Sequence, residues 1–191
     1  MKISILLPYK ENFSATYAGA VSLFVKDTVK LSEYKKYITV FGNTNLKNIF
    51  KLSYKNIDLK KNIIQSGSKL YVNEFLKFEN KLPSDLIEIH NRPNYFHLIY
   101  NNINNQKIVL YFHNDPLTMT GSKSIIDRKK LLTYATKIIF NSHWSRKRFL
   151  QGIKGTHLNS EKLSVIYQSI NPKKVSLMKK KKWITFVKKT K

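Results

Sequence analysis

Short apolar runs alternate with segments of helical periodicity along most of the chain, and this alternation restricts the fold more than any other feature. The runs KISILLP (2–8) and KIVLYF (107–112) have the length of strands, and their residues do not alternate between apolar and polar. Segment 14–32 instead places side chains on one helical face: Val21, Phe24, Val25, Thr28 and Val29. We therefore expect an α/β fold with a parallel sheet, helices on both faces and right-handed connections.

The other expected elements follow the same two patterns. The further expected strands are residues 37–42, 85–90, 137–140 and 163–168. The further expected helices are residues 68–82, 93–103, 124–135 and 142–153. Pro93 fits the first turn of its helix, where its missing N–H is no loss. Residues 43–66 are polar and support only a weak strand within 56–65.

Length and composition bound the class of protein. A chain of 191 residues is expected to fold mainly as one domain. It contains no cysteine, which excludes disulfides and thiolate metal sites and suits a reducing compartment. The apolar run 3–7 is too short for a signal peptide, and no run reaches the roughly 18 apolar residues of a membrane span. These features indicate a cytoplasmic protein, soluble or peripheral on a membrane.

The formal net charge of +24 has two explanations. Lysines are spread along the whole chain, which is also rich in Asn, Ile, Tyr and Phe, and AT-rich codons encode all of these residues. Base composition therefore accounts for much of the charge. The alternative is an anionic partner: nucleotide phosphates, an acidic lipid surface or nucleic acid.

Several well-known motifs are absent from the sequence. There is no G-x-G-x-x-G after the first expected strand, which disfavours a dinucleotide site, and no G-x-x-x-x-G-K-[ST] phosphate loop. G-x-S-x-G is missing, which argues against an α/β-hydrolase, and the five histidines lack H-E-x-x-H spacing.

Polar and titratable residues follow several expected strands. The residues concerned are Tyr9, Lys10, Glu11 and Gly19 after the first strand, then Glu88, His90, Asn91 and Arg92, then His113, Asn114 and Asp115, then Asn141, Ser142 and His143, and finally Ser169 and Asn171. In an open parallel sheet, ligands bind beyond the carboxyl ends of the strands, so these groups predict a site at that edge. Structural explanations stay open for single residues: close packing for Gly19, a loop histidine for His113, a helix cap for Ser142 and a solvated or ion-paired carboxylate for Glu88.

Five segments at these strand ends resemble a known family. In order, they are ISILLPYKENFSATYAGAVSLFV (3–25), DLIEIHNRP (85–93), YFHNDP (111–116), KIIFNSHWSRKRF (137–149) and VIYQSINP (165–172). Together they resemble the amino-terminal half of a GT-B glycosyltransferase, family 4-like. The resemblance implies a Rossmann-like domain at 1–172 that binds mainly the acceptor. A second domain would grip the nucleotide-diphosphate sugar, and retaining, metal-independent hexosyl transfer without a cofactor would build a cell-envelope glycan.

The resemblance also implies roles for residues. His113 would be the catalytic residue, leaning toward the transferred sugar. Gly19 and Ser142, each beside a helix start, would meet the donor phosphates. A set of residues would bind the glycan or glycolipid acceptor: Glu88, His90, Asn91, Arg92, Asn114 and Asp115. Contact with an anionic membrane face fits the charge, whereas nucleic acid is not the partner that the resemblance implies.

The last residues, KKKKWITFVKKTK (179–191), fit this resemblance. In the family, a strand like WITFV opens the donor-binding domain, so we expect 173–191 to be a basic linker and the start of a second domain that the chain lacks. A lysine run from an A-rich stretch of gene suggests a frameshift or a sequencing slip. Two alternatives remain open: a shorter, genuine C-terminus packed on the domain edge, and a basic Rossmann-like binding module for an anionic polymer, nucleic acid or membrane.

Overall fold

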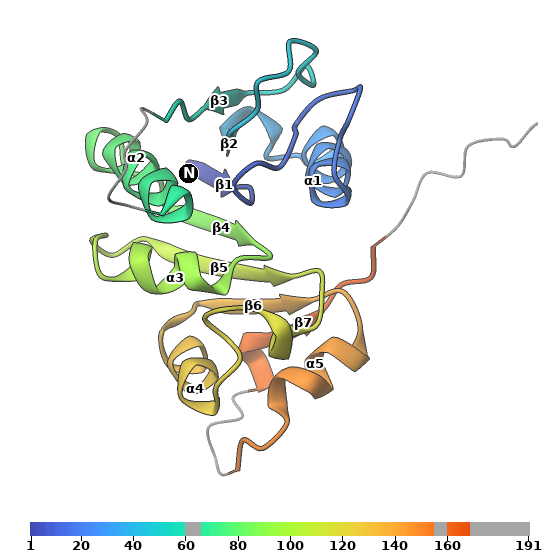
Figure 1. Cartoon of the computed structure of the whole chain (residues 1–191), viewed down its shortest axis with the longest axis vertical. Coiled ribbons are helices and arrows are strands. Elements are labelled where there is room, and N and C mark those ends of the chain that lie inside the picture. Colours follow the sequence, from blue (N-terminus) through green and yellow to red (C-terminus); the bar gives the residue numbers. More distant parts are fainter. Residues whose placement is uncertain (60–65, 155–159, 169–191) are drawn as a thin grey trace, which may run out of the picture.

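Seven parallel strands form one sheet in the order β3-β2-β1-β4-β5-β6-β7 in the computed structural model of the chain (Figure 1). The structure describes residues 1–59, 66–154 and 160–168. The strands are β1 (Ile3–Leu6), β2 (Ile38–Gly42), β3 (Tyr54–Asn56), β4 (Leu86–His90), β5 (Lys107–Phe112), β6 (Lys137–Phe140) and β7 (Leu163–Val165). The expected parallel α/β fold is confirmed.

Helices connect successive strands, except that a loop joins β2 to β3. They are α1 (Ala20–Leu31), α2 (Gly67–Lys81), α3 (Pro93–Tyr100), α4 (Ile125–Tyr134) and α5 (His143–Leu150), with short 3-10 helices η1 (Lys35–Tyr37), η2 (Pro116–Thr118) and η3 (Ser160–Lys162). Pro93 is the first residue of α3, as the sequence predicts. Ser66, Ser124 and Ser142 cap α2, α4 and α5, because each hydroxyl accepts a hydrogen bond from the first helical turn.

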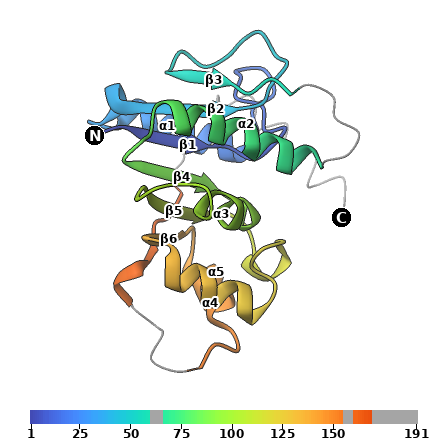
Figure 2. The same cartoon turned by 90° about the vertical axis from the view of Figure 1, so that its left-hand side faces the viewer.

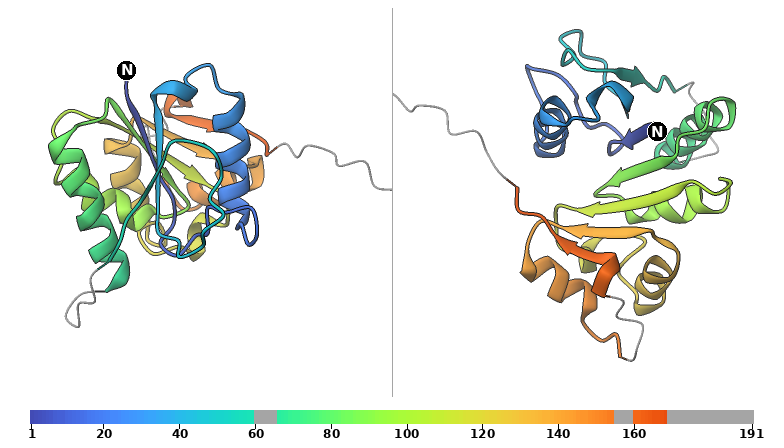
Figure 3. Two further views of the ribbon diagram at one scale, coloured as in Figure 1. Left: turned by 90° about the horizontal axis from the view of Figure 1, so that it is seen from above. Right: turned by 180° about the vertical axis from the view of Figure 1, so that it is seen from behind.

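The two faces of the sheet are covered unequally. Figure 2 shows α2, α3 and α4 in front of the sheet and α1 behind it. The larger hydrophobic core lies under α2 to α5, and the smaller one lies between α1 and strands β1 and β2. On the α1 side, strands β4 to β6 line an apolar groove of about 280 Å³ that Phe24, Tyr111 and Ile166 flank. The view from above in Figure 3 shows α1 on the opposite side of the sheet from α2.

Some expected boundaries are wrong, for local reasons. The helix expected over 14–32 begins only at Ala20, because the backbone before it pairs with another loop: Ala15 N–H donates to Asn48 O and Phe50 N–H to Phe13 O. Strand β3 falls in the polar segment for which the sequence gives no firm assignment. Its hydrogen bonds to β2 come from the backbone, and Tyr54 is its one large apolar side chain.

Some predictions fall on residues that the structure does not describe. These are the boundary at 172/173, Ser169, Asn171 and the strand-like 183–187. None of the helices in the described residues is long and apolar enough to cross a membrane.

Candidate functional site

Three strand ends bring the predicted site residues to one edge of the sheet. His90 ends β4, His113 directly follows β5, and Ser142 is the second residue after β6. Since all strands are parallel, this is the carboxyl edge, and the predicted placement is confirmed. Hydrogen bonds tie the three ends together: the Asn141 side-chain amide donates to His113 O at 2.7 Å, and His113 N–H donates to Asn91 Oδ1 at 3.3 Å.

A hydrogen-bonded chain of side chains leads to His113. Glu88 Oε1 lies 2.5 Å from His90 Nε2, and His90 Nδ1 lies 2.8 Å from His113 Nε2. The amide nitrogen of Gln168 contacts the remaining ring nitrogen, His113 Nδ1. His90 has no exposed surface, whereas the Glu88 side chain is 25% exposed and borders the apolar groove. Both ring nitrogens of His90 are therefore occupied within the protein.

Aromatic rings enclose the two histidines. The Tyr111 ring stacks on His113 with centroids 4.6 Å apart and on His90 at 5.4 Å, and Phe24 of α1 meets His113 edge-on at 5.2 Å. Burial among these rings, together with the positive charge that His90 can carry, lowers the pKa of His113 to about 3. Burial and the Glu88 carboxylate raise the pKa of Tyr111 to about 12. His113 is thus a neutral imidazole at physiological pH.

The start of α1 carries an internal carboxylate. Glu11 Oε1 accepts a hydrogen bond from Ser22 N–H in the first turn, at 3.1 Å. A Cβ atom at Gly19 would lie 2.0 Å from the same oxygen, so the glycine is what allows Glu11 to approach. The positive end of a helix attracts anions, and here the anion is the protein's own. The sequence predicts that Gly19 meets a donor phosphate, and that role stays a prediction.

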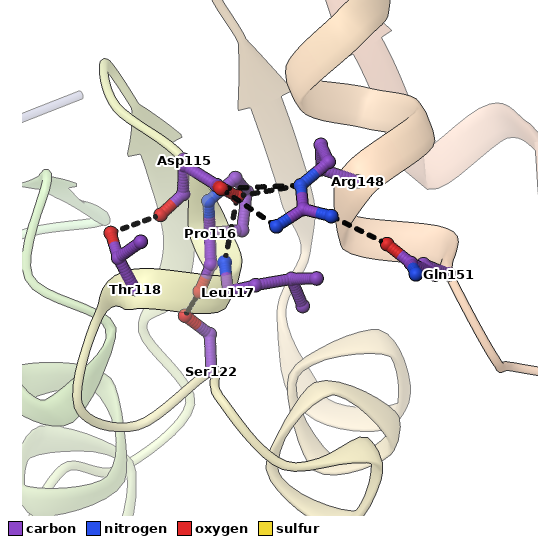
Figure 4. Close-up of polar contacts among 7 residues, drawn as sticks. All are labelled: Asp115, Pro116, Leu117, Thr118, Ser122, Arg148 and Gln151. Carbon is purple, nitrogen blue, oxygen red and sulfur yellow. Dashed lines mark hydrogen bonds and ion pairs between the residues drawn. The ribbon is translucent and has the colours of Figure 1, made fainter.

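Asp115 holds the loop after β5 against α5 (Figure 4). Its carboxylate accepts hydrogen bonds from Leu117 N–H and from Nε and Nη2 of Arg148, and Thr118 donates to its carbonyl. Burial acts to raise the pKa of Asp115, but the hydrogen bonds from Arg148 and Leu117 and the charge of Arg148 outweigh it and hold the pKa low. These contacts engage the carboxylate that the sequence predicts for acceptor binding.

The other predicted residues lie around the same edge. Ser142 Oγ accepts from Ser145 N–H, the capping role left open for it, and its contact with phosphate stays a prediction. Arg92 Nη1 donates to Asn91 O at 2.8 Å, and both residues line a cavity of about 300 Å³ with Thr118. Asn114 is exposed to solvent at the same edge.

A second, polar cavity of about 420 Å³ opens beyond β1 and β2. Its lining includes Lys10, Asn12, Asn43, Asn45 and Asp58. Lys10 adopts a left-handed backbone conformation with φ of 65°. Sequence reasoning names Lys10 but not the asparagines, because residues 43–66 have no strand pattern that would place them at this edge. Across the described residues, no cluster of three His, Asp or Glu side chains could hold a metal ion.

Comparisons with known proteins identify solved structures that have a similar fold. No family model matches the chain, and no curated protein matches it. Among solved structures, Anabaena HepE in complex with UDP-glucose superposes with a TM-score of 0.63 at 16% identity, over 97% of this chain and 50% of HepE. For a glycosyltransferase from Rickettsia africae, the TM-score is 0.56 at 13% identity, over 98% of this chain and 49% of that one.

A UDP-N-acetylglucosamine 2-epimerase from Rickettsia bellii is similar at a TM-score of 0.51 and 11% identity, over 88% of this chain and 45% of the epimerase. The chain spans about half the length of each of these structures. At these identities the likeness establishes the fold alone: a glycosyltransferase-like, Rossmann-like α/β domain that corresponds to half of a GT-B structure.

Proposed function

We propose that this chain is the amino-terminal, acceptor-side half of a GT-B glycosyltransferase, family 4-like. The complete enzyme would transfer a hexose from a nucleotide-diphosphate sugar to a glycan or glycolipid acceptor, on the cytoplasmic side of the cell envelope. Retaining, metal-independent and cofactor-free chemistry belongs to the same proposal, as do the domain at 1–172 and the linker at 173–191.

One observation carries the proposal: His113 lies at the carboxyl edge of a sheet whose fold resembles that of HepE, which was solved with UDP-glucose. Burial also lowers the pKa of His113 to about 3, which favours the neutral imidazole. Its main chain is tied to β4 and β6 through Asn91 and Asn141, so its position is fixed by the sheet and not by a free loop. A neutral, positioned imidazole can exchange hydrogen bonds with sugar hydroxyls without placing a positive charge beside an oxocarbenium-like centre.

The residues divide into roles. His113 would orient the transferred sugar, and the starts of α1 at Gly19 and of α5 at Ser142 would face the diphosphate. Asn91 and Arg92 line the 300 Å³ cavity and Asn114 is exposed at the same edge, where acceptor hydroxyls would bind. We assign Glu88 and His90 to the support of His113, because His90 is fully buried, and Asp115 to the support of the loop through Arg148.

Catalysis would depend on positioning and on stabilising the leaving diphosphate. The glycosidic bond to the diphosphate breaks, the acceptor oxygen bonds to the anomeric carbon, and the acceptor proton leaves with the diphosphate or passes to solvent. Because the fold neighbours are about twice as long, we expect this chain alone to show no transfer and only weak, salt-sensitive binding of the donor.

Calorimetry with a panel of nucleotide sugars tests this, first on the chain alone and then on a fusion, at about residue 187, to the donor-side half of an enzyme of the same fold. We expect turnover in the fusion and its loss in His113→Ala, with the fold intact by circular dichroism. Tight, selective binding by the chain alone at physiological salt would contradict the half-enzyme proposal.

The second candidate is a basic binding module for an anionic polymer, nucleic acid or membrane surface. The net charge of +24 favours it, as does α5, where exposed Trp144 stands beside Arg148. Such binding would fall steeply with salt and would not depend on His113. Vesicles with anionic lipid and a duplex oligonucleotide, each titrated against wild type and His113→Ala, separate the two candidates.

A further inference from the structure

Both ring nitrogens of His113 have a partner in the protein, but one partner is buried and the other is exposed. Nε2 faces His90 Nδ1 at 2.8 Å, and His90 Nε2 faces the Glu88 carboxylate at 2.5 Å. Nδ1 faces away from this chain of side chains, toward the exposed Gln168. One nitrogen of His113 is therefore internal and the other points to the edge where a ligand would bind.

The chemistry of the partners orders the protons. A carboxylate only accepts hydrogen bonds, so His90 Nε2 carries a proton that it donates to Glu88. A neutral His90 then has a lone pair at Nδ1 and accepts from His113 Nε2–H. A neutral His113 in turn has its lone pair at Nδ1, where the Gln168 amide nitrogen is a donor. All of these contacts are satisfied by this one direction of donation.

We propose that Glu88 and His90 are positioning residues that fix the tautomer of His113, so that His113 presents an unprotonated Nδ1 as a hydrogen-bond acceptor for a sugar hydroxyl. The inference rests on the proposed function for the identity of the ligand. A carboxylate that holds an imidazole in one tautomer through its distal nitrogen is an established device in enzymes. Here a second imidazole is inserted between the carboxylate and the working ring.

The side chains around His90 and His113 favour a single tautomer of each ring. Tyr111 stacks on both rings, and its raised pKa keeps it neutral, while Phe24 covers them from α1. The charged group that contacts the pair is Glu88, at the mouth of the groove. If the Glu88 carboxyl group were removed, His90 would lose the acceptor for its Nε2 proton, and both tautomers of His113 would become accessible.

The structure also shows what a ligand must displace. The Gln168 amide donates to His113 Nδ1, as a sugar hydroxyl would. A donor hydroxyl in that place would find the lone pair already oriented. A ligand that offers only acceptors there would be rejected, because it would meet a lone pair.

The test is the ring-nitrogen spectrum of the ¹⁵N-labelled full chain, recorded by long-range ¹H–¹⁵N correlation at pH 7. Protonated and unprotonated ring nitrogens of a neutral histidine resonate far apart, so each tautomer is read directly. We expect His113 to be protonated at Nε2 and His90 at Nε2, each as a single tautomer. A doubly protonated His90, or a His113 protonated at Nδ1, overturns the proposal on wild-type protein alone.

Two variants separate positioning from packing. Glu88→Met keeps the side-chain volume and removes the acceptor, so we expect loss of the single His113 tautomer in favour of a mixture. Glu88→Gln keeps an acceptor oxygen, and we expect it to retain the wild-type tautomer. A wild-type spectrum in Glu88→Met would overturn the proposal.

Turnover in the fusion to a donor-side half distinguishes this inference from the proposed function. If the tautomers are as expected and the fusion turns over none of the nucleotide sugars in the panel, the proposed function fails and the positioning chain stands. If the fusion turns over a nucleotide sugar while His113 is protonated at Nδ1, the proposed function stands and the positioning chain fails.

Discussion

Arg148 in α5 holds Asp115 with two of its nitrogens, since Nε and Nη2 lie 3.1 and 3.0 Å from Oδ2 (Figure 4). Because Asp115 follows His113 by two residues, this ion pair ties the loop of the candidate site to the helix that begins after the next strand. Asp115 also caps η2 through Leu117 N–H. Asp115 therefore holds the loop after β5 both to α5, through Arg148, and to η2, through Leu117 N–H.

Asp115→Asn should destabilise the protein by about 1 kcal/mol, because it removes the charge from a two-nitrogen contact and weakens a cap, both partly exposed. Urea denaturation at pH 7 measures the change. Glu74→Gln is the matched control, since Glu74 pairs with the well-exposed Lys77 and should cost less than about 0.5 kcal/mol. Equal losses in the two variants would contradict a special role for Asp115.

His113 should make the stability of the protein depend on pH in the acid range. Its pKa is about 3 when folded, against an ordinary histidine in the unfolded chain, so between these values the unfolded state binds a proton that the folded state does not. Stability is then full above about pH 6.5 and falls toward pH 3, by about 1.4 kcal/mol per pH unit at most. The lowered pKa of Asp115 adds a loss of the same sign at the acid end.

Urea midpoints between pH 4 and 7 measure this slope. His113→Gln should flatten it, because the replacement cannot titrate. His143→Gln, at an exposed position at the start of α5, should leave the slope as it is in wild type. The prediction would be wrong if both variants kept the wild-type slope.

The sequence predicts the sheet well because its strands are apolar on both faces, so the runs at 107–112 and 137–140 could be assigned from composition alone. It also predicts which residues meet at the carboxyl edge, since parallel strands make that a matter of topology. What it does not predict is the contact between His90 and His113. That contact depends on the register of β4 against β5, in which His90 faces Tyr111, and no periodicity reports register between neighbouring parallel strands.

The sequence also does not predict which side chains donate hydrogen bonds to backbone carbonyls that are distant along the chain. Arg128 is one of three consecutive basic residues in α4, yet it is 3% exposed and donates from Nη1 to the carbonyls of Phe149 and Gln151 at the end of α5. The hydrogen bonds from Arg128 to these carbonyls depend on where α4 lies relative to the end of α5, which the sequence does not predict.

Arg128→Met should therefore cost roughly 2–4 kcal/mol, because it leaves two carbonyls at the end of α5 without this buried donor. Thermal and urea unfolding measure the loss. Lys129→Met, one residue along the same helix and exposed, is the control and should lie within about 0.5 kcal/mol of wild type. A mild effect of Arg128→Met, similar to that of Lys129→Met, would show that water replaces the guanidinium.

Glu11→Gln should have opposite effects on stability and on anion binding. The Glu11 carboxylate accepts from Ser22 N–H beside Gly19, so its charge stabilises the start of α1 by roughly 0.5 kcal/mol and repels a phosphate that approaches the same helix end. Glutamine keeps an acceptor oxygen and removes the charge. If donor phosphates bind at Gly19, removing one like charge at about 4 Å in water is worth about 1 kcal/mol, or roughly fivefold tighter binding of pyrophosphate or UDP-glucose.

Calorimetry at low salt measures the affinity of each variant for pyrophosphate and UDP-glucose. Glu33→Gln is the control, because Glu33 is an exposed acid just beyond the other end of α1 and changes the net charge equally. Equal gains in the two variants would mean that only net charge matters and would remove the start of α1 from the donor site. Weaker binding in Glu11→Gln would contradict the predicted repulsion between Glu11 and the phosphate.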